Sequence, residues 1–188
     1  MRISDDRYRR ERLRMELALR FLSHEARTQT IRSWTGLSDD RIRKLYRSYT
    51  RESQQPLPRH RGKSPQQSAY FTRSLRLQEE TALLASVLTL LGVVPVAAEA
   101  PGSLAALTRG ELLCQAFEAY AALLPGAQIS FEHAVFLATA LTSGEELRLG
   151  DCSGCGSLLV TERVALRAAR CHRCTSHHGK ARVAPGSR

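Results

Sequence analysis

Apolar residues in the first part of the chain recur at helical spacing. Leu13, Leu17 and Phe21 follow one another at four-residue steps within residues 7–22, and arginines fill much of the rest of that segment. This spacing predicts a basic helix with a single buried stripe.

Two shorter helices are predicted to follow, over residues 26–35 and 39–49. The turn between them reads Thr35-Gly36-Leu37-Ser38. Glycine accepts a positive φ, and serine is a favoured N-cap residue, especially before the acidic first turn that Asp39 and Asp40 provide. The pattern therefore indicates two helices that meet at a tight corner.

The hydrophobic pattern stops over residues 50–68 and resumes after them. Three prolines and four glutamines in that segment indicate a basic linker or an extended surface segment, which could also run along phosphates. Helices are predicted over residues 74–91, 104–124 and 131–141, and their Leu- and Ala-rich sequences should pack together and leave an apolar face for a second protein.

These elements predict a mainly α fold in five parts. The parts are a basic helical region with a helix-turn-helix (1–50), a linker (51–69), a helical body that binds a partner (70–149), a small zinc-ribbon-like segment with four cysteines (150–176) and a basic tail (177–188). Residues 81–98 carry no charge, but Gly92 and Pro95 interrupt them, so a buried or partner-facing helix is expected there and no membrane span.

Charge changes this picture, because it is distributed unevenly. The chain has 28 Lys and Arg against 18 Asp and Glu, for a net charge of +10 and a pI near 10.0. Residues 1–76 carry a net +11, residues 77–150 a net −6 and residues 151–188 a net +5. Two basic ends favour a polyanionic partner, above all nucleic acid, although basic tails also occur on proteins that never bind DNA. No secretory signal follows Met1, so a cytoplasmic location is expected.

Four cysteines near the C-terminus form the most specific motif. Cys152, Cys155, Cys171 and Cys174 have the spacing C-x2-C-x15-C-x2-C, which is typical of zinc sites. Two residues between thiolates allow a tight turn to present both sulfurs to one ion, and the fifteen-residue excursion has room for two short strands. One structural Zn²⁺ per chain is the prediction, because four thiolates leave no open coordination position for catalysis.

Other interpretations of the cysteines carry less weight. A rubredoxin-type iron uses the same ligands, disulfides are disfavoured without export, and a redox C-x2-C does not need a second pair. His172, His177 and His178 are expected to be bystanders beside a complete set of thiolates, and Cys114 to be a small buried apolar residue.

Two sets of cations are candidates for DNA contact. If Gly36 is the glycine of a helix-turn-helix, the helix after it occupies the recognition position. Its exposed side would then offer four long cations, Arg41, Arg43, Lys44 and Arg47. The second set lies in and between the cysteine pairs and consists of Arg163, Arg167, Arg170 and Arg173. The alternatives are a three-helix packing unit with a basic face, and a ribbon whose cations only keep it soluble.

Several segments together resemble the FlhC family, the zinc-binding subunit of the bacterial flagellar transcriptional activator. The resembling segments are Thr35-Gly36-Leu37-Ser38, Ile42-Arg43-Lys44-Leu45-Tyr46-Arg47, Arg61-Gly62-Lys63-Ser64-Pro65, the mid-chain helices and the cysteine quartet, so the resemblance covers nearly the whole chain. It implies a mostly helical fold that ends in a cysteine-ligated zinc site.

The resemblance also implies a function. It suggests a hetero-oligomer, specifically a hetero-hexamer, with an FlhD-type subunit, which binds double-stranded promoter DNA and recruits RNA polymerase to flagellar genes. A zinc-stabilised adaptor without direct DNA contact is the alternative. An enzyme is not expected, because the sequence has no Ser/His/Asp arrangement, no phosphate-binding glycine loop and no acid pair with a shared cleft.

Overall fold

The computed structural model describes residues 2–52, 58, 60, 62–95, 106–164, 170, 171 and 173–175. Its elements, in chain order, are α1 (Arg2–Ser23), α2 (Thr28–Thr35), α3 (Asp39–Glu52), the short 3-10 helix η1 (Ser68–Phe71), α4 (Leu75–Leu90), α5 (Ala106–Leu123), α6 (Phe131–Ser143), β1 (Leu147–Asp151) and β2 (Leu158–Glu162). The mainly helical fold is confirmed. All six predicted helices are present, with ends close to those expected except that α1 begins at Arg2 and not at residue 7.

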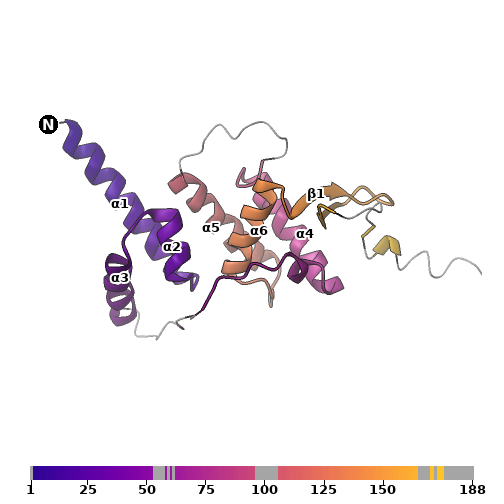
Figure 1. Cartoon of the computed structure of the whole chain (residues 1–188), viewed down its shortest axis with the longest axis horizontal. Helices are drawn as coiled ribbons and strands as arrows, with labels where there is room; N and C mark the ends of the chain where they lie inside the picture. Colours follow the sequence, from indigo (N-terminus) through magenta and orange to yellow (C-terminus); the bar gives the residue numbers. More distant parts are fainter. Residues whose placement is uncertain are drawn as a thin grey trace, which may run out of the picture.

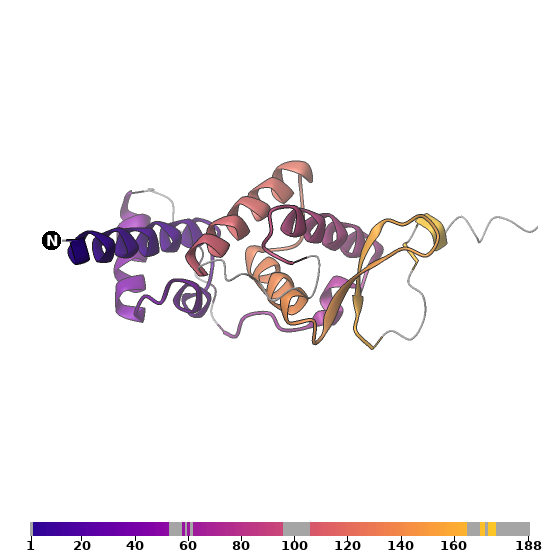
Figure 2. The same ribbon diagram turned by 90° about the horizontal axis from the view of Figure 1, so that it is seen from above.

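The elements follow one another along a long molecule (Figures 1 and 2). The first three helices occupy one end, α4, α5 and α6 form the middle, and the β1–β2 hairpin extends from the middle toward the opposite end. The predicted basic N-terminal region and the cysteine segment thus lie at opposite ends of the described chain.

Helix α1 is anchored in the middle of the molecule through its C-terminal half only. Leu17 and Phe21 are fully buried, as predicted, whereas Leu13 is 42% exposed, so its place in the buried stripe was predicted wrongly. The reason is visible in Figure 1: the N-terminal half of α1 projects beyond the helices that cover its other half. Spacing along a helix fixes which face is apolar, but it does not show where the covering elements stop.

The crossing of α1 and α5 depends on a glycine and an ion pair. A Cβ atom on Gly110 would stand 2.7 Å from Cδ2 of Leu17, so the two helices approach more closely than a larger residue permits. Beside this contact, Arg20 donates to Glu111 (2.5 Å) and to Glu118 (2.6 Å). Helix α1 is therefore held against α5 by close packing and by charge.

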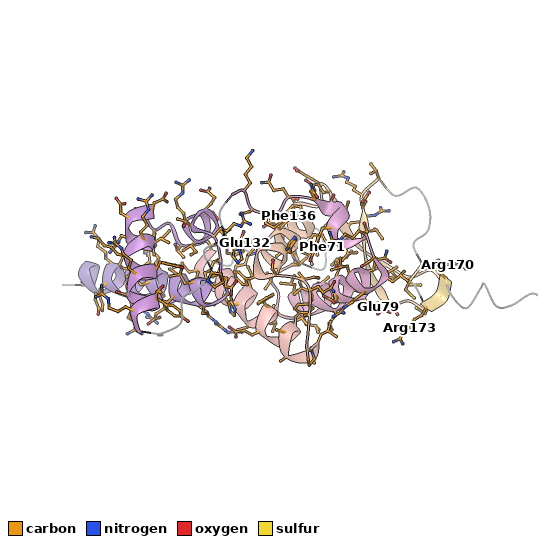
Figure 3. The ribbon with its side chains drawn as sticks, turned by 90° about the horizontal axis from the view of Figure 1, so that it is seen from below. Phe71, Glu79, Glu132, Phe136, Arg170 and Arg173 are labelled. Carbon is orange, nitrogen blue, oxygen red and sulfur yellow. The ribbon has the colours of Figure 1, made fainter. Side chains whose placement is uncertain are left out.

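A buried acid connects α6 to the start of α2. The carboxylate of Glu132 accepts hydrogen bonds from the backbone amide of Arg27 (2.8 Å) and from the hydroxyl of Thr30 (3.0 Å). The guanidinium of Arg27 in turn donates to the carbonyl of Lys63 (2.6 Å), in the extended segment that follows α3. Figure 3 labels Glu132 and Phe136, both of α6, with Phe71, and the ring centroids of Phe71 and Phe136 are 5.9 Å apart. The start of α2 and the extended segment after α3 are thus joined to α6.

Helices α2 and α3 meet at the predicted corner. Gly36 follows α2 with φ of 70°, and its amide donates to the carbonyl of Arg32 (2.9 Å). Leu37 and Ile42 are buried beyond the corner. The structure therefore contains the predicted corner between α2 and α3. That the two helices act as a DNA-binding helix-turn-helix stays a prediction.

Within the part of the chain that the structure describes, none of the helices combines the length and the apolar character needed to cross a lipid bilayer.

Candidate metal centre

The first cysteine pair is positioned by the β1–β2 hairpin. The two strands pair antiparallel, with Asp151 opposite Leu158, and Cys152 to Ser157 form the connection between them. The amide of Cys152 donates to the carbonyl of Ser157, and the amide of Gly156 donates to the carbonyl of Cys152, both at 2.8 Å. Among the described residues the fifteen-residue excursion contains β2, whose partner β1 precedes Cys152.

The hairpin is fixed to the helical body at its base. Leu147 is fully buried, and β2 packs against α4. Strand β1 also lies against α6, whose C-terminal Gly144 adopts a φ of 65° and turns the chain into the hairpin. The hairpin therefore carries Cys152 and Cys155 at a set distance from the core.

The second cysteine pair closes the site. Cys171 and Cys174 stand in a short turn in which the amide of Thr175 donates to the carbonyl of Cys171 (3.0 Å). The Sγ atoms of all four cysteines lie within 4.8 Å of one another, and those of Cys155 and Cys171 are 3.6 Å apart. Ligands at about 2.3 Å from a tetrahedral zinc ion lie about 3.8 Å from one another, so the four sulfurs are close enough to bind one metal ion.

Backbone amides point at these sulfurs. The Sγ of Cys152 accepts from the amides of Cys171 (3.2 Å) and Gly154 (3.4 Å), and that of Cys171 accepts from the amide of Cys174 (3.5 Å). The first two hydrogen bonds lower the pKa of the Cys152 thiol to about 6. Two of the four sulfurs thus receive amide donors, which suits a metal that binds thiolates, because the thiolate is the form that these hydrogen bonds stabilise.

Gly154 is required by the proximity of the second pair. A Cβ atom at this position would lie 2.9 Å from the Sγ of Cys174 and 3.1 Å from its Cβ. The glycine thus makes room for a ligand in the turn between Cys152 and Cys155.

We expect Gly154→Ala to weaken metal binding about tenfold or more, because the added methyl group displaces Cys174 from the ion. Competition with a coloured zinc chelator would measure the affinity. Gly150→Ala is the matched control, since a Cβ at Gly150 meets nothing within 4 Å. Equal affinities for the two variants would contradict the close contact at Gly154.

The predicted cations near the cysteines lie mostly at the surface. Arg163, Arg170 and Arg173 are exposed, and Figure 3 shows Arg170 and Arg173 at the far end of the molecule from α1. Arg163 donates to the carbonyl of Gly144 (3.1 Å), which joins the end of β2 to the end of α6. Arg167 and the three histidines near the cysteines lie outside the described residues.

Cys114 is fully buried in the core, as predicted, and burial raises the pKa of its thiol to about 12.

The predicted cations of α3 all lie on its exposed side. Arg41, Arg43, Lys44 and Arg47 are exposed, whereas Ile42 is buried. Arg41 forms an ion pair with Glu11 of α1, and Arg43 one with Asp40 (3.1 Å). These four side chains therefore form a surface that two neighbouring acids partly neutralise.

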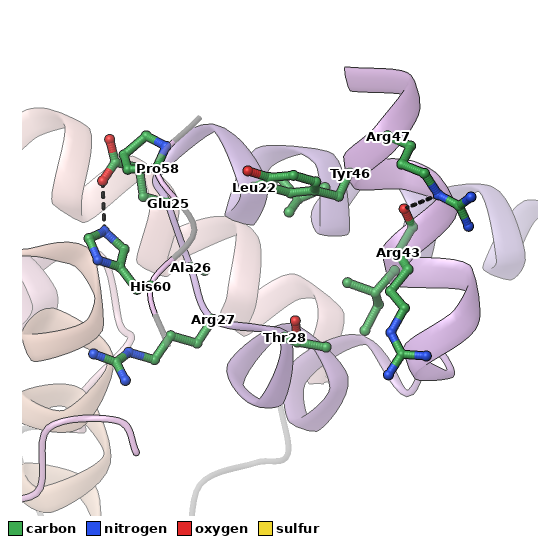
Figure 4. Close-up of a pocket in the computed structure, with 11 residues that line it drawn as sticks. Leu22, Glu25, Ala26, Arg27, Thr28, Arg43, Tyr46, Arg47, Pro58 and His60 are labelled. Carbon is green, nitrogen blue, oxygen red and sulfur yellow. Dashed lines mark hydrogen bonds and ion pairs between the residues drawn. The ribbon is translucent and has the colours of Figure 1, made fainter. Parts of the chain in front are cut away.

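A cavity of about 170 Å³ separates α3 from the start of α2 (Figure 4). Leu22, Ile42 and Tyr46 contribute to its lining. The guanidinium groups of Arg43 and Arg47 point away from Glu25 and His60 on the opposite side, so the aliphatic stems of the two arginines face the cavity. Packing of these stems keeps the two guanidinium groups at the surface, where Arg43 pairs with Asp40 and Nε of Arg47 donates to the carbonyl of Arg43.

Buried acids in the helical body were missed at the level of sequence. Glu80 is 2% exposed and Glu132 is 7% exposed. Glu80 follows Leu77 by three residues and precedes Leu84 by four, which places it on the buried stripe of α4. That position was the signal that could have identified it as a structural acid.

No protein-family model matches the chain, and neither does any curated protein. The resemblance to the FlhC family therefore stays a prediction.

Proposed function

We propose that this protein is a DNA-binding transcription regulator that carries a structural zinc ion. The observation that carries the proposal is the exposed face of α3, where Arg41, Arg43, Lys44 and Arg47 project from a helix whose other face is anchored by buried Ile42. Arginine and lysine on such a face can contact phosphates and the edges of guanines. The turn at Gly36 holds this helix at a corner with α2, an arrangement that presents one helix to a DNA groove in other proteins.

Zinc is the metal we infer for the four cysteines. Four sulfur ligands favour Zn²⁺, which prefers tetrahedral coordination, and rubredoxin-type iron is the competing occupant. Cys152, Cys155, Cys171 and Cys174 would hold the ion and leave no position for water or substrate, so its role is to stabilise the fold.

The resemblance to the FlhC family supplies the finer part of the proposal. On this view the chain works in a hetero-oligomer with an FlhD-type subunit and helps recruit RNA polymerase at promoters of flagellar genes. The exposed basic cations near the cysteines, Arg163, Arg170 and Arg173, would provide a second contact with the DNA.

We expect the double substitution Arg43→Ala and Arg47→Ala to weaken binding to duplex DNA by about tenfold to a hundredfold, because both cations contribute contacts to phosphates or bases. Fluorescence anisotropy with a labelled duplex at several salt concentrations would measure the loss. Metal content and far-UV circular dichroism should be unchanged, since both guanidinium groups lie at the surface.

The matched control is Arg73→Ala with Arg148→Ala, which removes the same charge from exposed positions outside α3. If the two double variants lose affinity equally, only net charge matters, and α3 is not the contact surface.

The adaptor function is supported by a different observation. Leu90, near the end of α4, is 83% exposed, and Leu123, at the end of α5, is 63% exposed. Exposed leucines on a weakly charged helical body favour a protein partner. A wild-type protein that has no affinity for duplex DNA at low salt, but still binds a protein partner, would establish the adaptor function instead.

A further inference from the structure

The projecting half of α1 forms a second cationic surface next to α3. It extends past the other helices in Figures 1 and 2, and residues 6–14 include five arginines. Arg7, Arg9, Arg10 and Arg12 are exposed, and Arg14 is partly exposed. A helix that projects into solvent has no packing need for so many like charges, so the segment requires another explanation.

The arrangement of these arginines around the helix is not random. At about 100° per residue, Arg7, Arg10 and Arg14 fall within about 60° of one another. Phe21 lies within the same arc and Leu17 about 20° outside it; both are fully buried where α1 crosses the body. One face of α1 is thus apolar in its covered half and arginine-lined in its projecting half. A shallow concavity lined by Asp6, Arg7, Arg10, Glu11 and Arg14 follows this face.

Glu11 joins the α1 arginines to those of α3. Its carboxylate forms an ion pair with Arg41 of α3 and lies 3.8 Å from the guanidinium of Arg14. Helices α1 and α3 are in contact, so the pair fixes the relative position of the two sets of cations. Arg41 of α3 and Arg14 of α1 thus share one acid, and Arg10 and Arg7 continue from Arg14 along the same face of α1.

We propose that this face of α1 contacts the phosphodiester backbone of the same duplex DNA that α3 binds. This inference rests on the proposed function. Arg7 and Arg14 are separated by about 10 Å along the helix, at about 1.5 Å per residue. Phosphates along one strand follow one another at about 3.4 Å of rise, so the three arginines reach several phosphates. Such contacts fix orientation and add affinity without reading sequence.

The pattern of apolar residues favours DNA over an anionic membrane. A helix that lies in a membrane surface needs an apolar face opposite its cations. Residues 6–14 include only two apolar side chains, Tyr8 and Leu13. These two lie about 140° apart around the helix, so they do not form one face. The covered half of α1 does not offer an apolar face to a membrane either, because Leu17 and Phe21 are buried in the protein.

The test compares two double variants of the full-length protein that remove the same charge from opposite sides of α1. Arg7→Ala with Arg10→Ala changes the proposed face, and Arg9→Ala with Arg12→Ala changes the other side. The probe is a fluorescent 20-base-pair duplex of arbitrary sequence, titrated at several salt concentrations. Anionic vesicles of phosphatidylglycerol are titrated in parallel, and circular dichroism checks the helix content of each variant.

We expect the Arg7/Arg10 variant to bind the duplex about tenfold more weakly than wild type. Its slope of log affinity against log salt should fall by about 2, because about 0.9 is lost for each phosphate contact. The Arg9/Arg12 variant should stay within about twofold of wild type. Equal losses in both variants, or an unchanged Arg7/Arg10 variant, would overturn this inference; if Arg43→Ala with Arg47→Ala still weakens binding, the proposed function survives. Wild-type protein that binds the vesicles and not the duplex would overturn both.

Discussion

Replacing Cys171 by serine is expected to abolish stoichiometric metal binding and to release the C-terminal cysteine segment from its folded state. Structural zinc sites contribute about 10 to 16 kcal/mol of binding free energy at neutral pH, and the loss of one thiolate removes much of it. The turns that carry the cysteines offer little else to replace that energy, because Cys155 is exposed and Cys171 and Cys174 are only partly buried. Elemental analysis of the purified protein and limited proteolysis would detect the two losses.

The helical body should survive this substitution. Leu147 is fully buried at the base of the hairpin, and β2 packs against α4 independently of the cysteines. The expected result is therefore local unfolding, with the helical circular dichroism signal nearly intact.

Cys114→Ala is the control for the loss of a thiol, since Cys114 lies in the core and outside the cluster. That variant should keep one metal ion per chain. A Cys171→Ser protein with unchanged metal content, or disulfides among the four cysteines in the native protein, would refute the ligand assignment.

The cysteines could be identified from sequence because their chemistry depends on short spacing. Two residues between ligands restrict the geometry whatever the rest of the chain does. The route of the chain between the pairs was not predictable in the same way. Strand β1 pairs with β2 from outside the motif, because Leu147 requires burial against the helical body, and that requirement is a property of the tertiary fold.

The helices were predictable because helical spacing is also a short-range pattern in the sequence. The errors in their prediction show where such patterns fail. Periodicity identified the buried stripe of α1 at Leu17 and Phe21, and Ser74 and Ser130 cap α4 and α6 through their side chains. Leu13 was assigned to the core wrongly, because only the three-dimensional arrangement shows that the covering helices end before it. The buried acids were missed because charge was counted by segment, and a segment total does not distinguish an exposed Glu79 from a buried Glu80.

The substitution Glu80→Ala is expected to lower the free energy of unfolding of the helical body by about 3 kcal/mol, because it leaves buried polar partners without an acceptor. The Glu80 carboxylate accepts from the hydroxyl of Tyr120, the amide of Gln128 and Nε of Arg76, each at 2.8 Å. Tyr120 is fully buried, so its hydroxyl cannot turn to water when the acceptor is lost. Urea denaturation followed by circular dichroism would measure the change.

The same carboxylate makes stability depend on pH. Burial raises its pKa, but the hydrogen bonds from Gln128, Tyr120 and Arg76 outweigh that effect, and the pKa is lower than usual. A pKa that is lower in the folded than in the unfolded protein contributes stability above the unfolded value of about 4.3, and that contribution is lost as pH falls through the folded value. The stability difference between wild type and Glu80→Ala should therefore shrink on acidification below about pH 4.

Glu79→Ala provides the matched control, because Glu79 is the preceding residue of the same helix and is exposed. Its free energy of unfolding should stay within about 0.5 kcal/mol of wild type, as for most surface substitutions. A loss of equal size in both variants would mean that helix propensity or net charge is responsible. In that case the hydrogen bonds that join α4 to Tyr120 of α5 and to Gln128 would contribute little to the stability of the helical body.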